Sequence, residues 1–189
     1  MTRCNPISIL FALLMLLGGA RTAAAAELPG ASVYRLDIVL VDQEGHGFRL
    51  GERRAKPVLV SMFYTSCQYV CPLIIDSLRK TQAALARDGG AKIDVLLVSF
   101  DPQRDTPARL KQVFAERKLD ASWTLARTDA ASVRKLAAVL DIQYRALANG
   151  DLNHSSAITL LAGDGRILAR TDKLGEVDAE FVDKVRAAR

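Results

Sequence analysis

The chain has 189 residues, of which 25% are charged, 50% hydrophobic and 6% aromatic, and this composition excludes a disordered polymer and a low-complexity fibre. The 26 lysines and arginines exceed the 21 acidic residues by only five and are spread along the chain, so no nucleic-acid partner is expected. Three cysteines are too few for a disulfide scaffold in a chain of this length.

The first 26 residues have the pattern of a secretory signal peptide. Arg3 precedes an apolar run, Ile7–Ala20, and Ala23–Ala26 offers small residues at the spacing of a cleavage site. The run has 14 residues, fewer than the roughly 20 needed to cross a bilayer, so a cleaved leader is favoured over an uncleaved anchor. We therefore expect export to the periplasm or to the outer face of the inner membrane, with residues 27–189 as a single folded domain.

Removal of the leader changes both the net charge and the cysteine count. It takes away two basic residues and no acidic residue, which leaves a net charge of +3. It also removes Cys4, so the exported domain keeps only Cys67 and Cys71. These two thiols are four positions apart in a protein bound for an oxidising compartment.

The exported domain begins with two short segments that predict an N-terminal β-hairpin. Leu36–Val41 and Phe48–Leu50 flank a turn in which Gly45 and Gly47 permit positive φ angles.

A strand–helix–strand unit follows the hairpin. Pro57–Thr65 and Ile93–Phe100 are mostly apolar, as expected of strands that are buried on both faces. Pro72–Arg87 lies between them and has a helical period, with Pro72 at the first helical position. Such a unit predicts a parallel pair of strands with a right-handed crossover.

The second half of the chain predicts helices followed by a second hairpin and a closing helix. In chain order, its expected elements are a helix from Thr106-Pro107, a helix from Asp129, strands at Ala157–Leu161 and Arg166–Arg170, and a helix through Val177–Val185. The whole order predicts an α/β sandwich of the thioredoxin-like kind, with a central mixed β-sheet flanked by helices.

Cys67 and Cys71 lie between the first central strand and its helix, where the positive end of a helix favours a thiolate. On a regular helix, Cβ atoms four residues apart are roughly 5–6 Å apart, whereas a disulfide needs about 3.5–4.5 Å. Two sulfurs that bind one metal ion can lie about 4 Å apart. The spacing therefore favours a metal, although Pro72 disfavours helical backbone at Cys71, so an irregular loop and oxidation stay open.

A plain structural pair of thiols is the other interpretation. A disulfide between residues four apart would close a very small loop and constrain the unfolded chain little, so it would be a poor staple.

Only two histidines could complete a metal site. His46 lies in the glycine turn of the first hairpin, where a solvated side chain is expected. His154 precedes the late strand Ala157–Leu161, and a thioredoxin-like fold brings that loop close to the first helix. Because imidazole and thiolates together suit copper or zinc, His154 is the candidate third ligand.

Three motifs of the sequence resemble the signatures of the Sco/SenC copper proteins. They are Phe63-Tyr64-Thr65-Ser66-Cys67 with Cys71-Pro72, then Ser99-Phe100-Asp101-Pro102-Gln103-Arg104-Asp105-Thr106-Pro107, and then Asn153-His154-Ser155. The resemblance covers most of the exported domain, roughly Val33 to Leu168, with the motifs in the right order.

This resemblance implies a thioredoxin-like domain that binds copper, as Cu(I) or Cu(II), through Cys67, Cys71 and His154. It further implies a metallochaperone, rather than an enzyme, that supports assembly of the binuclear copper site of cytochrome c oxidase subunit II. The partner would be subunit II or a copper-relay protein, and the chain would donate copper, reduce the cysteines of that site, or do both. An uncleaved leader would add an association with the membrane.

Two alternatives stay open at this point. A periplasmic thiol–disulfide oxidoreductase would use Cys67 and Cys71 as catalytic residues, carry no copper, and be indifferent to His154. Zinc is the second candidate metal, but it would want a fourth ligand that the sequence does not offer.

One position departs from the family pattern. The family usually has aspartate directly before the ligand histidine, and Asn153 stands there in this chain. An acidic neighbour could raise the basicity of the imidazole or orient its ring, and Asp151 is a candidate substitute.

The polar and aromatic residues near the motifs have simpler interpretations. Asp105 and Thr106 are expected to cap the following helix, which outweighs a role of Asp105 near the metal, and Asp101 is expected to fix the preceding turn. Packing roles, rather than ligand roles, are expected for the remaining residues of interest, namely Met62, Tyr64, Tyr69 and Trp123.

Overall fold

The structure is a computed structural model that describes residues 27–87, 89, 92–148 and 151–189. The expected signal peptide, residues 1–26, lies outside the described residues. Among the helices that the structure describes, none combines the length and the apolar character needed to span a membrane.

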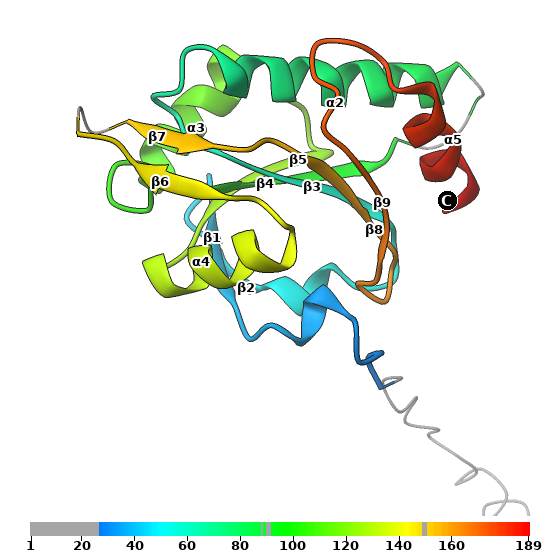
Figure 1. Cartoon of the computed structure of the whole chain (residues 1–189), viewed down its shortest axis with the longest axis horizontal. Coiled ribbons are helices and arrows are strands. Elements are labelled where there is room, and N and C mark those ends of the chain that lie inside the picture. The colour runs from blue at the N-terminus through cyan, green and yellow to red at the C-terminus, as the bar shows by residue number, and fades with distance from the viewer. Residues whose placement is uncertain (1–26, 88, 90–91, 149–150) are drawn as a thin grey trace, which may run out of the picture.

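A seven-stranded mixed sheet forms the centre of the molecule, in the order β2-β1-β5-β4-β3-β8-β9 (Figure 1). A separate two-stranded sheet, β6-β7, projects from one end. The strands are β1 (Val39–Asp42), β2 (Gly47–Arg49), β3 (Val58–Phe63), β4 (Asp94–Ser99), β5 (Trp123–Arg127), β6 (Tyr144–Ala146), β7 (Leu152–His154), β8 (Ile158–Leu161) and β9 (Ile167–Thr171).

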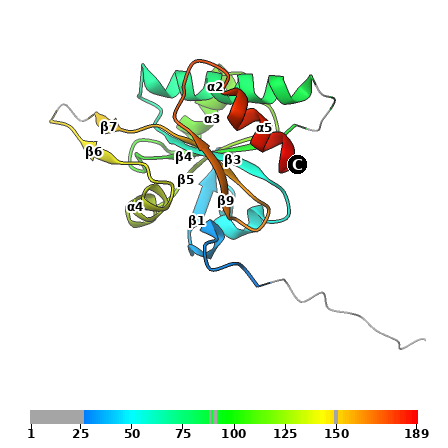
Figure 2. The same ribbon diagram turned by 45° about the vertical axis from the view of Figure 1, so that its right-hand side comes forward.

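Helices cover both faces of the large sheet, as the two ribbon views show. In Figures 1 and 2, α2, α3 and α5 lie on one face and α4 lies on the other. The α-helices are α2 (Val70–Ala86), α3 (Pro107–Glu116), α4 (Ala130–Val139) and α5 (Ala179–Ala187), and two short 3-10 helices are η2 (Val33–Arg35) and η3 (Leu50–Arg53). The predicted α/β sandwich with a mixed sheet is confirmed.

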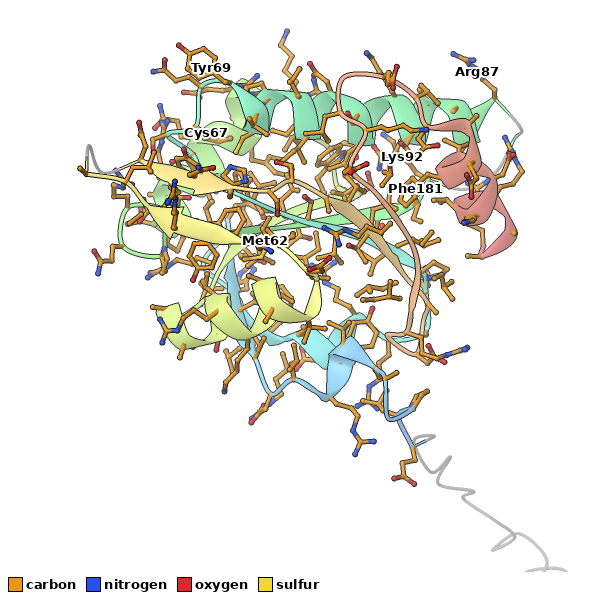
Figure 3. All side chains as sticks on the ribbon, viewed as in Figure 1. Met62, Cys67, Tyr69, Arg87, Lys92 and Phe181 are labelled. Carbon is orange, nitrogen blue, oxygen red and sulfur yellow. The ribbon has the colours of Figure 1, made fainter. Side chains whose placement is uncertain are left out.

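The parallel pair at the centre of the sheet, β3 and β4, is confirmed. Leu59 lies opposite Val95, and every residue of β3 is buried, as its continuous apolar run predicted. Side chains from both layers fill the space around the sheet (Figure 3). Met62 and Trp123 both lie in this core, as expected, and the Trp123 indole N–H donates to Gln82 Oε1 at 3.1 Å.

The N-terminal hairpin is confirmed, with a shorter first strand. β1 begins at Val39 because Val33–Arg35 form the helix η2 just before it. β1 and β2 pair antiparallel, and Gly45 in their turn has a φ of 86°, which an L side chain rarely adopts.

Two parts of the fold have no counterpart in the sequence prediction. β5 extends the parallel part of the sheet, with Trp123 opposite Val95. The hairpin β6-β7 consists of two strands of three residues each, and these are too short to show a period of their own.

Helix α2 begins earlier than the sequence predicts. It begins at Val70, so Cys71 and Pro72 both lie in its first turn, and the expectation that Pro72 opens the helix is wrong. A proline is tolerated there because the first N–H groups of a helix have no partner within it. Cys71 is thus held by regular helix, whereas Cys67 lies in the loop between β3 and α2.

Helix α3 begins at Pro107, and Thr106 is its N-cap, as predicted. The Thr106 hydroxyl accepts a hydrogen bond from the Arg109 N–H. We expect Thr106→Ala to lower the free energy of unfolding by about 1 kcal/mol, because this N–H group then loses its partner in the protein. Urea denaturation measures the loss, and Thr106→Ser is the matched control that keeps the hydroxyl. An equal loss in both variants would contradict the capping role.

Candidate metal centre

The two thiols lie at the carboxyl end of β3, one in a loop and one in a helix. Cys67 is half-buried, whereas Cys71 is buried with only 4% of its surface exposed. The Cys71 N–H, at the start of α2, donates to the Cys67 sulfur at 3.3 Å. Neither cysteine forms a disulfide. The predicted placement of a pair of thiols at the beginning of a helix is confirmed.

The hydrogen bonds at the start of α2 make the two thiols unequal. The Cys71 thiol, above all, lowers the pKa of Cys67 to about 4, against the opposing effect of burial, and the N–H groups of Cys71, Tyr69 and Val70 contribute further. The pKa of Cys71 is raised, first by the hydrogen bond to Cys67 and then by burial. At neutral pH the pair therefore holds one proton, on Cys71.

This inequality has a measurable consequence for alkylation. In the reduced, metal-free protein we expect iodoacetamide to modify Cys67 alone, at a rate that stays constant from pH 8 down to pH 5 because the thiolate persists there. Mass spectrometry of the labelled peptides measures the rates, and Cys67→Ser is the control that removes the fast site. A rate that falls from pH 9 with a midpoint near the ordinary cysteine pKa of about 8.5 would contradict the prediction.

His154 is the last residue of β7, and its ring is held between aromatic side chains. The Tyr64 ring meets it edge-on at 5.7 Å between centroids, and the Phe100 ring lies at 4.9 Å with an angle of 40°. Nδ1 lies 3.0 Å from the Ser155 carbonyl oxygen. In the tautomer in which Nδ1 donates to this carbonyl, Nε2 carries the lone pair that a metal ion needs.

The fold brings these three predicted residues together from distant parts of the sequence. One ligand atom from each of Cys67, Cys71 and His154 lies within 4.8 Å of the other two. Around one metal ion, with sulfur bonds of about 2.3 Å and three ligands in a plane, these atoms would lie about 4 Å apart. The set therefore fits a metal ion after a closure of less than about 1 Å.

A cleft of about 460 Å³ is lined by two of the three residues, Cys67 and His154, whereas Cys71 is buried and does not line it. Cys67 and Tyr69 contribute to one side of it, and Leu147, Leu152 and His154 of the β6-β7 segment contribute to the other. The cleft gives an incoming group access to the Cys67 sulfur and to the His154 imidazole.

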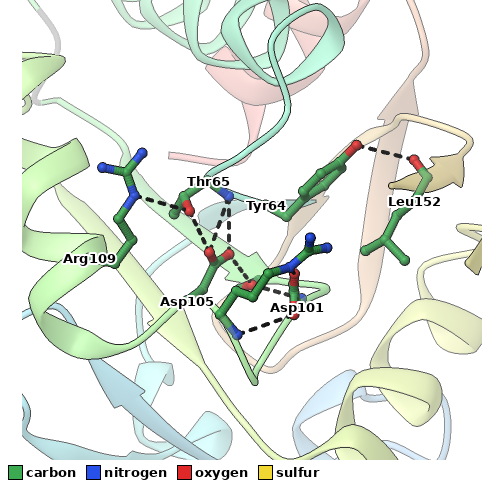
Figure 4. A network of polar contacts seen from close by, with 8 residues as sticks. Tyr64, Thr65, Asp101, Asp105, Arg109 and Leu152 are labelled. Atoms are coloured by element: carbon green, nitrogen blue, oxygen red, sulfur yellow. Dashed lines mark hydrogen bonds and ion pairs between the residues drawn. The ribbon is translucent and has the colours of Figure 1, made fainter. Parts of the chain in front are cut away.

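Asp105 corrects the sequence prediction, because it does not cap α3. It is 1% exposed and accepts hydrogen bonds from the Thr65 N–H, at 3.1 Å, and from the hydroxyls of Thr65 and Ser99 (Figure 4). Arg109 Nε donates in turn to the Thr65 hydroxyl at 3.3 Å. Asp105 therefore links the end of β4 to Thr65, which follows β3. Thr65 lies two residues before Cys67.

Asp101 fixes the turn after β4, as predicted. Its carboxylate accepts a hydrogen bond from the Arg104 N–H and pairs with the Arg104 side chain (Figure 4). The Asp101 carbonyl also accepts from the Asp105 N–H at 2.9 Å.

The two tyrosines of the first motif have different environments. Tyr64 is buried, packs on His154, and donates its hydroxyl to the Leu152 carbonyl at 3.3 Å, so it links β3 to β7. The packing role expected for Tyr69 is wrong, because its side chain projects from the start of α2 and the residue is 83% exposed.

The remaining polar candidates lie where the sequence placed them. Asn153 and Asp151 both line the cleft beside His154. His46 is in the β1-β2 turn, with 80% of its side chain exposed and Nδ1 at 3.7 Å from Asp42 Oδ2. The described residues that gather as a possible metal site therefore do not include His46.

Comparison with known families decides the relationship of this chain. The SCO1/SenC family model matches residues 28–188. The chain belongs to the SCO1/SenC family. The resemblance drawn from its three motifs is thus confirmed, together with the thioredoxin-like fold of the family.

Individual relatives of this SCO1/SenC protein agree with the family match. The SCO2-like protein of Rickettsia felis is 33% identical over 78 residues, which are 40% of this chain and 37% of that protein, so the chain spans well under half the length of this curated relative. Bradyrhizobium japonicum ScoI, solved with copper bound, is 25% identical, with a TM-score of 0.67 over 80% of this chain and 97% of ScoI. A structure from Aquifex aeolicus VF5 is 29% identical, with a TM-score of 0.73 over 84% and 94% of the two chains.

Proposed function

We propose that this SCO1/SenC protein is an exported copper chaperone that supports maturation of the binuclear copper site of cytochrome c oxidase subunit II. The observation that carries the proposal is the cluster of Cys67, Cys71 and His154, whose ligand atoms lie within 4.8 Å of one another. Copper bound to the related ScoI supports the choice of metal. The metal is the cargo of the chain, and these three residues would hold it.

The ligand set suits copper in both of its common oxidation states. Soft thiolates select Cu(I), whereas an imidazole also suits Cu(II). Zinc commonly takes four ligands in closed structural sites, and the cluster offers three. With only three protein ligands, a further position stays open to a sulfur or imidazole of the receiving protein.

The two thiols differ in whether they release a proton when the metal binds. Cys67 has its pKa lowered to about 4 and needs to release no proton when it binds the metal. Cys71, whose pKa is raised, must lose its proton as the second sulfur ligand forms. We therefore expect loading to release about one proton per chain near neutral pH.

Export is the setting that the proposal requires. The leader pattern of residues 1–26 supports it, and so does a pair of thiols suited to an extracytoplasmic compartment. If the leader is not cleaved, the same domain would act while tethered to the membrane.

A thiol–disulfide oxidoreductase is the second candidate, and the unequal thiols favour it specifically. The Cys67 thiolate would attack a partner disulfide and form a mixed disulfide. The Cys71 thiol would then lose its proton and displace the partner's second thiolate, leaving Cys67 and Cys71 oxidised and the partner reduced. His154 has no part in this sequence.

Variants tested in cells that depend on this chain for oxidase assembly distinguish copper delivery from thiol reduction. We expect both His154→Ala and Cys67→Ser to abolish oxidase activity if the chain delivers copper. Survival of activity in His154→Ala, together with its loss in Cys67→Ser, would instead establish thiol reduction as the function. Tyr69→Phe is the control for expression, because it changes one hydroxyl on an exposed side chain.

A further inference from the structure

Among the strands that the structure describes, β6 pairs only with β7, so its other edge, beside helix α4 and outside the candidate metal centre, is free. In both ribbon views, β6 lies between its partner β7 and α4 (Figures 1 and 2). A groove of about 570 Å³ runs along this edge, lined by β6 and by the C-terminal half of α4. The hairpin thus offers one strand edge to another chain.

The hydrogen-bond pattern of the hairpin determines which backbone groups face the groove. The Leu147 N–H donates to the Asp151 carbonyl and the Ser155 N–H to the Gln143 carbonyl, both at 2.8 Å. Because antiparallel pairs alternate, the odd-numbered residues of this segment bond across the hairpin. The N–H and C=O groups of Tyr144 and Ala146 therefore point away from β7, toward the groove.

The side chains of the groove favour an acidic occupant. Ala137 and Ile142 give it an apolar floor, and both are buried. Arg134 and Arg145 are its only charged lining residues among those described, and within that part of the chain neither side chain has an ion pair or a hydrogen bond. None of the described residues that line the groove carries a carboxylate that could balance them.

We propose that this groove binds an extended, acidic segment of a partner protein, which adds as a strand to β6. Backbone groups of Tyr144 and Ala146 would hold the segment, as in other cases of strand addition, and the two arginines would select its carboxylates. Tyr144 lies opposite His154 in the hairpin, so a bound partner would be held beside the candidate metal centre. This proposal adds a partner-binding surface to the proposed function. A role of the groove in copper transfer rests on that function, but binding of the acidic segment itself needs no metal.

A designed peptide tests the groove without copper. The probe is a seven-residue peptide of alternating glutamate and valine, added to the reduced, metal-free protein and followed by NMR. We expect the Tyr144 and Ala146 amides to shift and to exchange more slowly with solvent. The Leu147 amide, already bonded to Asp151, should keep its protection and report an intact hairpin. A peptide with lysine in place of glutamate should bind at least tenfold more weakly.

Substitutions in the groove sharpen the test. Ala146→Pro removes an N–H that points outward, a place where an edge strand tolerates proline, and should weaken binding about tenfold. Ala146→Ser keeps the N–H and should bind within twofold of the unaltered protein. Arg134→Ala and Arg145→Ala should each weaken binding about two- to fivefold, the range of an exposed ion pair.

Three results would overturn the proposal. Equal binding of the acidic and basic peptides would remove the charge argument, and unchanged binding by Ala146→Pro would exclude strand addition. Sedimentation of the free protein as a dimer that Ala146→Pro dissociates would show that a second copy occupies the edge instead. Because no arm of the test contains copper, failure of the copper proposal leaves these outcomes unaffected.

Discussion

His154→Ala is expected to abolish binding of Cu(II) while the protein still binds Cu(I), with an affinity at least about 100-fold lower. Two thiolates alone suit Cu(I), but loss of the imidazole removes the nitrogen ligand that Cu(II) favours, and changes even beyond the ligands alter metal affinity by about 10–100-fold. Competition with a Cu(I) chelator under anaerobic conditions measures the Cu(I) affinity. The sulfur-to-copper charge-transfer absorbance reports binding of Cu(II).

Two other variants bracket this result. Cys67→Ser removes the sulfur that is ionised at neutral pH, so it should abolish binding of both oxidation states. Asn153→Ala is the matched control, because Asn153 lines the same cleft next to His154 and is outside the ligand cluster. If His154→Ala retained Cu(II) as tightly as Asn153→Ala does, His154 would not be a ligand.

Asp105→Ala is expected to lower the free energy of unfolding by about 3 kcal/mol, the larger of the two stability effects predicted for this protein. The substitution leaves the hydroxyl of buried Ser99 and the N–H of half-buried Thr65 without their acceptor. Buried donors that lose a charged partner are costly, because neither water nor another acceptor replaces it. The midpoint and slope of urea denaturation measure the loss.

The same substitution should reach the metal centre through the backbone. Thr65 lies two residues before Cys67, so release of its N–H loosens the loop that holds the first sulfur. We expect a roughly tenfold weaker Cu(I) affinity, in the range seen when supporting groups of a metal site are removed. Asp105→Asn is the companion variant, since it keeps the volume and one acceptor oxygen. Its free energy of unfolding and its Cu(I) affinity should fall between those of the unaltered protein and those of Asp105→Ala. A stability loss with unchanged copper affinity would limit Asp105 to the fold.

The sequence predicted best those elements whose pattern is long enough to have a period. The buried runs that form β3 and β4, and the capped beginnings of α3 and α4, match their predicted places within two residues. β6 and β7 are three residues each and half-exposed, so no alternation marks them. β5 is short as well, and it carries polar residues at Thr124 and Arg127.

The features of the candidate site also differ in how far local sequence pattern could predict them. Proximity of Cys67 to Cys71 follows from their spacing, and a positive helix end beside them follows from the strand–helix order. Proximity of His154 depends on the hairpin that the sequence pattern misses, so it was expected only from the placement of its loop in a thioredoxin-like fold and from the resemblance to a family. The role of Asp105 depends on the ends of β3 and β4 lying side by side, and a local capping pattern cannot show that.

Trp123 is the single tryptophan of the chain, and its position makes intrinsic fluorescence a selective probe. Its indole is bonded to Gln82, which is 11 residues along α2 from Cys71, or about 16 Å of helix. Emission from this ring therefore reports the end of the sheet remote from the sulfurs. A constant emission spectrum during copper addition would mean that loading stays local, whereas a shifted spectrum would mean that the whole domain repacks.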